Sequence, residues 1–188
     1  MSQEMTMSAL RGDPAREQTT VAKRRRSLLH QGVQWLCVGI LAFASFSIVS
    51  HFVLESVTVS GWSMAPSLRD TDHYILNRWI YHVRAPERQE IVVIRDPETQ
   101  GLAVKRVIAG AGDLVFLKQG AVYVNGRRIA EPYLPAGIRT FPAGQSGTKL
   151  FKCGPDQYFV LGDNRMNSVD SRTYGPVVRS SVLGMIIQ

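Results

Sequence analysis

The sequence predicts a mainly β protein, built from antiparallel sheets and preceded by one N-terminal transmembrane helix. Three observations carry this prediction. An uncharged apolar stretch occupies residues 33–53, short runs rich in Val, Ile and Tyr recur behind it, and no segment after Glu55 keeps a helical period. We therefore expect three parts: a basic tail over residues 1–32, a membrane segment over 33–53 and one β domain over 54–188.

The tail is polar over its first twenty residues and has no apolar period, so we expect it to be disordered. Near its end stands the densest basic run of the chain, Lys23-Arg24-Arg25-Arg26. The net charge of +7 alone would allow nucleic-acid binding. However, the basic residues form no stripe with interleaved aromatics, and we expect no nucleic-acid partner.

The stretch from Val33 to Val53 holds 21 residues without Asp, Glu, Lys or Arg. As a helix it would be roughly 30 Å long, enough to cross a bilayer. Ala42-Phe43-Ala44 has the small-x-small pattern of a cleavage site, but apolar character continues to Val53, which favours an uncleaved signal-anchor. Because the basic run precedes the span and only Glu55 is charged in the fifteen residues after it, we expect a cytoplasmic N-terminus and an exported β domain.

Eight runs bounded by turn formers are predicted as strands. They are Ser56 to Val59, His73 to Leu76, Glu90 to Arg95, Ala103 to Ile108, Leu114 to Leu117, Ala121 to Val124, Tyr158 to Leu161 and Leu183 to Ile187. Asn125-Gly126 is the strongest hairpin signal, because a type I′ turn needs positive φ at both positions. Loose apolar spacing allows a short helix within Leu76 to Val83. Residues 131–148, with three prolines and three glycines, are expected to form an exposed loop or a small lobe.

The two cysteines, Cys37 and Cys153, lie in different parts of the chain, and no CxxC or Cys/His cluster occurs. We therefore expect no disulfide framework, no metal and no cofactor.

Two segments about forty residues apart carry candidate chemistry: Gly61-Trp62-Ser63-Met64-Ala65-Pro66-Ser67-Leu68 and residues 105–113. The first offers the Ser63 hydroxyl and the second the Lys105 amine. A serine is a poor nucleophile until a base takes its proton, and a lysine among apolar residues can be that base if burial depresses its pKa. Taken singly, Ser63 is more simply a turn hydroxyl and Lys105 a solvated strand lysine. Together they suggest a Ser/Lys protease.

A third segment, Gly162-Asp163-Asn164-Arg165-Met166-Asn167-Ser168-Val169-Asp170-Ser171-Arg172, follows. In this order the three segments resemble the main motifs of bacterial type I signal peptidases, and a single span before the serine also fits that family. The resemblance implies a signal-peptidase-like complex β fold. It also implies a membrane-bound endopeptidase that removes signal peptides from exported preproteins, cutting after small residues at positions −1 and −3. The implied partners are signal peptides and the lipid bilayer, with the catalytic domain on the outer side of the inner or plasma membrane.

The resemblance also implies residue roles. Ser63 is the nucleophile, Lys105 the general base, and Ser168 the hydroxyl that orients the lysine amine. Structural support is expected from Asp163 and Asn164 in a turn and from Asp170 and Arg172 as an ion pair. An ordinary lysine pKa near 10.4 leaves roughly 4.6 kcal/mol against the free amine at neutral pH, so burial must supply most of that difference.

Cleavage passes through an oxyanion, for which the Ser63 N–H is the expected donor. Some family members carry a serine two residues before the nucleophile as second donor, whereas Gly61 stands here. Because Gly61 has no side chain, a second side-chain donor stays unassigned, and glycine at this position suggests a close backbone approach. An extended substrate can pair with the strand before Ser63, with Val57 and Val59 facing its pockets or packing in the core. Met64 borders the pocket for the residue before the cut, or packs in the core.

The chain departs from the family pattern at two turns and at one wall of the site. Thr71-Asp72 and Arg88-Gln89-Glu90 stand where the family commonly shows Gly-Asp and Arg-Gly-Asp, and Ala103 replaces a frequent aromatic residue. Two alternatives stay open: a specialised maturation peptidase of a conjugation or surface-assembly system on the same fold, and a catalytically dead, anchored peptide-binding domain.

Overall fold

The computed structural model describes residues 30–47, 54–58, 60–144 and 147–187, and it divides the chain into two compact units, Met1–Val49 and Ser50–Gln188. In the first unit residues 30–47 form a helix. Residues 30–32, expected in the disordered tail, belong to this helix, whose first turn therefore begins three residues before the predicted apolar stretch.

The predicted membrane segment is described only in part. None of the helices in the described ranges combines the length and the apolar character needed to cross a membrane. The last part of the predicted span, residues 48–53, lies outside the described residues, as does the predicted tail up to residue 29.

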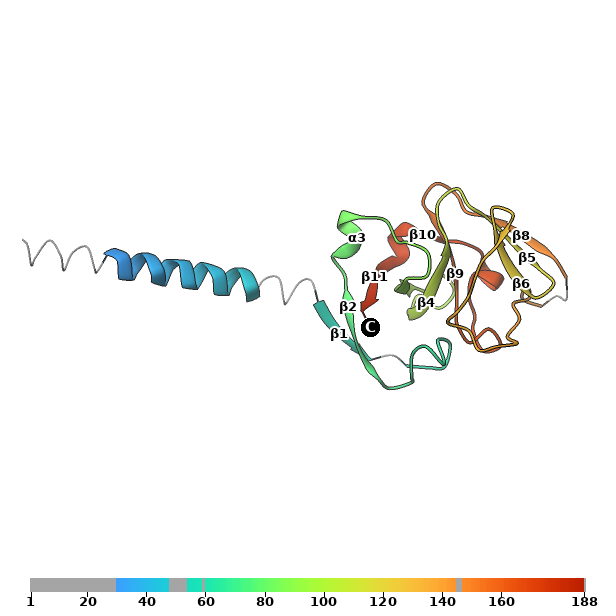
Figure 1. Cartoon of the computed structure of the whole chain (residues 1–188), viewed down its shortest axis with the longest axis horizontal. Helices are drawn as coiled ribbons and strands as arrows, with labels where there is room; N and C mark the ends of the chain where they lie inside the picture. Colours follow the sequence, from blue (N-terminus) through green and yellow to red (C-terminus); the bar gives the residue numbers. More distant parts are fainter. Residues whose placement is uncertain (1–29, 48–53, 59, 145–146, 188) are drawn as a thin grey trace, which may run out of the picture. The chain divides into compact units, whose positions relative to one another are not determined.

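The second unit consists of antiparallel sheets and short helices, which confirms the predicted mainly β fold (Figure 1). Its larger sheet has seven strands in the order β1-β2-β11-β3-β4-β9-β10 among the described residues. These strands are β1 Leu54–Thr58, β2 His73–Asn77, β3 Ile91–Arg95, β4 Leu102–Ala109, β9 Gln157–Leu161, β10 Val177–Val178 and β11 Val182–Ile187. β11 is the last of the described strands in chain order, and it lies between β2 and β3 in the sheet.

The smaller sheet has the order β7-β6-β5-β8, and β5, β6 and β8 are labelled together in Figure 1. Its strands are β5 Leu114–Lys118, β6 Ala121–Val124, β7 Arg127–Arg128 and β8 Lys149–Lys152. Asn125 and Gly126 have φ of 51° and 80°, which confirms the predicted hairpin. β8 was not predicted, because only Phe151 of its four residues is buried and pairing with β5 decides its conformation.

The two sheets share a hydrophobic core, and β4 lies within it. One cluster joins the smaller sheet to the larger one, with Val115, Leu117, Val122 and Val124 packed near Ile108, Phe159 and Leu161. β4 consequently ends in five consecutive buried residues, Lys105 to Ala109. A strand covered on both faces loses the alternation of exposed and buried residues. Two cationic side chains, Lys105 and Arg106, are therefore buried side by side in sequence.

Short helices and turns complete the unit. The helices are α3 Ile80–Val83, α4 Ser171–Tyr174 and the 3₁₀ helix η1 Arg179–Ser181. α3 falls within the range where a short helix was allowed, whereas α4 was not predicted. Thr71 and Gln89, the two turn positions that depart from the family pattern, have φ of 67° and 72°, in the left-handed region that glycine occupies most easily.

Candidate functional site

The turn between β1 and β2 holds Ser63 half-buried at the surface of the core. Met64 and Leu68, each 1% exposed, anchor this turn in an apolar cluster, and the Leu68 N–H donates to the Met64 carbonyl at 3.0 Å. At the start of the turn Gly61 has a φ of 102°, and its N–H donates to Asp70 Oδ1 at 2.8 Å. Two contacts therefore fix this turn: Met64 is buried in the core, and Gly61 is hydrogen-bonded to Asp70. Ser63 lies between these two residues.

Lys105 projects from β4 and is 4% exposed. Burial lowers the pKa of its amine below the ordinary lysine value, while Asp170 and Asp96 raise it and Arg172 lowers it further. The amine forms no ion pair or hydrogen bond with the part of the chain that the structure describes. A buried amine without a fixed carboxylate gives up its proton more readily than a surface lysine does.

Gly162 is the point where the three predicted motifs meet. β4 and β9 pair with Arg106 opposite Leu161, so Lys105 in β4 and Gly162, the residue after β9, are the next positions beyond this pair. A Cβ on Gly162 would lie 2.2 Å from Ser168 Oγ and 2.6 Å from the Ser63 carbonyl oxygen. That carbonyl also accepts a hydrogen bond from the Asn164 N–H at 2.9 Å. Backbone contacts at Gly162 thus bring the serine turn, the lysine strand and the third motif together.

Two buried ion pairs stabilise the backbone around Gly162. Arg172 donates to both oxygens of Asp170 at 2.8 and 2.9 Å, and Asp170 Oδ2 also accepts the Gly162 N–H at 3.0 Å. Arg106 donates to both oxygens of Asp163 at 2.8 and 2.6 Å. Both carboxylates have fully buried side chains. Asp170 thereby ties Arg172 to the Gly162 backbone, and Asp163 ties Arg106 of β4 to the segment that follows β9.

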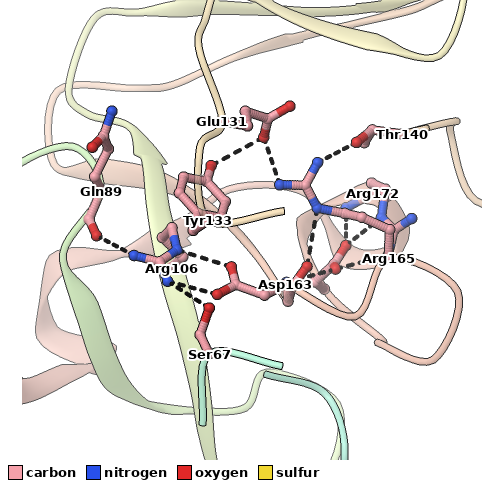
Figure 2. Close-up of polar contacts among 11 residues, drawn as sticks. Ser67, Gln89, Arg106, Glu131, Tyr133, Thr140, Asp163, Arg165 and Arg172 are labelled. Carbon is pink, nitrogen blue, oxygen red and sulfur yellow. Dashed lines mark hydrogen bonds and ion pairs between the residues drawn. The ribbon is translucent and has the colours of Figure 1, made fainter. Parts of the chain in front are cut away.

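A further set of residues, absent from the sequence predictions, reaches the site from the segment between β7 and β8. Arg165 binds the Gly162 carbonyl, Thr140 and Glu131, and Tyr133 lies over Arg106 (Figure 2). Thr140 is only 1% exposed, so the expectation of an exposed loop over residues 131–148 is wrong at this point. Prolines and glycines correctly excluded regular structure there, but they carry no signal of long-range ion pairs.

The other predicted site residues differ in how far their positions fit the roles expected of them. Ser168 Oγ is buried and has no hydrogen-bond partner among the described residues, so its predicted bond to the Lys105 amine is not formed here. Val57 and Met64 pack against one core cluster, and Val59 lies outside the described residues. No described atom comes within 4 Å of a Cβ built on Gly61, so φ rather than a close approach within the chain requires this glycine.

Two of the histidines have contacts within the described β domain. The described residues hold no group of three or more His, Cys, Asp or Glu side chains that could bind a metal ion. His73 shares a hydrogen bond of 3.0 Å with Thr58, and His82 stacks on Trp79.

Comparison with known proteins gives one consistent result. A family profile described as "Signal peptidase, peptidase S26" matches residues 32–187. The chain is 34% identical over 158 residues to a Signal peptidase I from Bacillus amyloliquefaciens, covering 80% of this chain and 81% of the relative. It is 40% identical over 142 residues to a Probable signal peptidase I-2 from Synechocystis, covering 72% and 62%. A crystal structure of a signal peptidase I from Enterococcus faecalis aligns with a TM-score of 0.48 and 29% identity, covering 55% of this chain and 98% of that chain.

Proposed function

The chain belongs to the S26 family of signal peptidases, and from that premise we propose that it is a membrane-anchored serine endopeptidase that removes signal peptides from exported preproteins. Ser63 is its nucleophile and Lys105 its general base. One observation carries the chemical part of this proposal. The only described lysine that is buried lies opposite Gly162, on which the carbonyl of Ser63 and the side chain of Ser168 both pack.

The reaction proceeds in two halves. Ser63 Oγ attacks the scissile carbonyl carbon while the Lys105 amine takes the hydroxyl proton. The resulting ammonium gives this proton to the leaving amine, which becomes the N-terminus of the mature protein, and the signal peptide stays bound as an ester. A water then attacks the ester with Lys105 again taking its proton, and that proton returns to Ser63 Oγ as the signal peptide leaves.

Lys105 can act as a base only if its amine is neutral near neutral pH. Burial supports this requirement, since it lowers the pKa of the amine. The unpartnered hydroxyl of Ser168 supports an orienting role, because catalytic hydrogen bonds often tighten only when substrate is bound. We assign Ser168 to hold the Lys105 amine in the substrate complex.

The oxyanion is stabilised by the Ser63 N–H. This N–H donates to no acceptor in the described part of the chain, which leaves it free for the substrate. Gly61 offers no side chain, and Asp70 already accepts its N–H. A second donor therefore does not come from position 61.

The substrate runs along β1, which is an edge strand of the larger sheet in the described order. An extended peptide can add to such an edge and place alternate side chains in pockets. Val57 already packs against the core, so the turn before Ser63 is the better candidate for a pocket wall. The anchor is the predicted span over residues 33–53, with residues 1–32 in the cytoplasm and residues 54–188 exported.

The test is cleavage of a preprotein by the full-length chain in detergent micelles. Ser63→Ala and, separately, Lys105→Met are expected to abolish cleavage while thermal unfolding stays cooperative. Ser180→Ala and Lys118→Met, which remove an exposed hydroxyl and an exposed amine, serve as matched controls and retain activity. Cleavage by either site variant at the wild-type rate would refute the Ser/Lys assignment, and an inactive wild type would favour a peptide-binding domain.

A further inference from the structure

Arg165 is a buried cation whose three nitrogens all bind different parts of the chain. Its side chain is 0% exposed. Nε donates to the Gly162 carbonyl at 3.0 Å, one terminal nitrogen donates to Thr140 Oγ1, and the other donates to Glu131 Oε1 at 2.5 Å. Figure 2 shows the guanidinium spread between these partners. Among them only Glu131 carries a charge, so it is the carboxylate that compensates the buried cation.

The Gly162 backbone is held on both sides of its Cα. Its N–H donates to Asp170, and its carbonyl accepts from Arg165. Its Cα faces the Ser168 side chain and the Ser63 carbonyl so closely that no Cβ fits between them. Any rotation of this peptide therefore moves against Ser63 and Ser168 together.

The segment that supplies Glu131 also reaches the lysine strand. The Tyr133 hydroxyl donates to Glu131 Oε1 at 3.0 Å, and the Tyr133 ring lies 4.0 Å from the guanidinium carbon of Arg106. Arg106 follows Lys105 in β4 and pairs with Asp163. Glu131 thus contacts Arg165, which binds the Gly162 carbonyl. Tyr133 contacts Arg106, which pairs with Asp163 (Figure 2).

We propose that Glu131 is a positioning residue for catalysis, which acts through Arg165 to hold the Gly162 peptide against Ser63 and Ser168. Without the Glu131 charge, Arg165 is a buried cation with only neutral partners and moves to find solvent or another acceptor. Its hydrogen bond to the Gly162 carbonyl is then lost. A displacement of about 1 Å at reacting groups costs about 10²-fold in rate. The segment between β7 and β8 is therefore part of the catalytic apparatus although it contains none of the reacting groups.

This inference rests on the proposed function, and steady-state cleavage of a peptide with small residues at −1 and −3 by the full chain in micelles tests it. Glu131→Gln is expected to lower kcat by about tenfold or more, with KM within about twofold, because substrate-binding groups are untouched. Arg165→Met is expected to lower kcat at least as much. If Glu131 acts through Arg165, the double variant has the kcat of Arg165→Met alone, since the second change removes nothing further.

The chain supplies a close control. Glu90, whose side chain is 14% exposed like that of Glu131, also accepts hydrogen bonds from one tyrosine and one arginine, Tyr81 and Arg84, and Arg84 contacts Met185 where Arg165 contacts Gly162. Glu90→Gln is expected to lower the melting temperature but to keep kcat within about twofold. If Glu131→Gln fails to fold, Glu131→Asp keeps the charge but shortens its reach and is expected to lower kcat several-fold.

Three results would overturn the inference. One is a folded Glu131→Gln enzyme with wild-type kcat, another is multiplicative effects of the two substitutions on kcat, and the third is a folded Glu131→Asp enzyme with wild-type kcat. A failure of the proposed function is distinguishable, because it would appear as absent cleavage by the wild type or as full activity of Ser63→Ala.

Discussion

Gly162→Ala places one methyl group where the three motifs meet. The added Cβ would lie 2.2 Å from Ser168 Oγ, 2.5 Å from Ser168 Cβ and 2.6 Å from the Ser63 carbonyl oxygen. Ordinary contacts of a Cβ begin at 3.4 Å. The Ser63 carbonyl must therefore retreat by about 0.8 Å, the difference between 3.4 and 2.6 Å, and Ser168 by at least as much.

These displacements set the expected magnitudes. Adding one methyl group to a filled site costs about 1–3 kcal/mol of unfolding free energy. Moving a nucleophile by about 1 Å costs about 10²-fold in rate. We therefore expect Gly162→Ala to fold with a lowered melting temperature and to lose about two orders of magnitude in kcat. Both are measured on the same preparation, by cleavage of a peptide with small residues at −1 and −3 and by a thermal melt.

Gly184→Ala separates the two effects. In β11 a Cβ would lie 2.8 Å from Leu76 Cδ1 and 2.6 Å from the Asn77 carbonyl oxygen, the same distance that separates a Gly162 Cβ from the Ser63 carbonyl oxygen. Its loss of stability should match that of Gly162→Ala while its kcat stays near wild type. A folded Gly162→Ala enzyme with kcat within about threefold of wild type would refute the reasoning, because the clash would then have been relieved without moving Ser63.

The other predictions concern the lysine and two turns. Burial lowers the pKa of Lys105, so activity should rise with pH through a midpoint below the ordinary lysine value, and a midpoint at the ordinary value would contradict burial. Asp170 raises the pKa of Lys105, so Asp170→Asn should lower that midpoint in a pH–rate profile. The unfolded chain binds this proton more readily than the folded one, so stability should rise with pH up to the ordinary lysine pKa, and Lys105→Met should raise the melting temperature at pH 7 while cleavage is lost. Gln89→Gly should raise the unfolding free energy by about 0.5 kcal/mol in urea titrations, because it relieves a left-handed φ at the expense of chain entropy. Asn125→Ala removes two side-chain hydrogen bonds of 2.9 and 2.7 Å and should cost about 1–2 kcal/mol with kcat/KM unchanged.

Local patterns were enough to predict most strands and the tightest turn. Asn125-Gly126 predicted its hairpin because the required φ values belong to two residues alone. β8 and α4 escaped prediction for the opposite reason. β8 is a strand because Phe151 packs opposite Val115, and α4 begins where the Asp170 side chain accepts the Arg172 N–H. Both depend on partners that a short window of sequence does not contain.

The candidate site divides in the same way. Ser63, Lys105 and the Asp170–Arg172 pair could be named from motifs, since each motif is a short run of residues. Glu131 and Tyr133 could not, because their partners lie in another motif, 34 residues away in the case of Arg165. The burial of Arg106 could not be predicted from its neighbours either, because its partner Asp163 lies 57 residues away.

The position of β11 has a consequence for the distance between Ser63 and Lys105. Ser63 stands on the turn between β1 and β2, and Lys105 on β4, which pairs with β3. Backbone pairing joins β2 to β3 only through β11, the strand made after all the others among those described. The proposed nucleophile and base therefore stand on two pieces of the larger sheet that only β11 joins by strand pairing among the described residues. A change in how β11 pairs with β2 or β3 would shift Ser63 relative to Lys105.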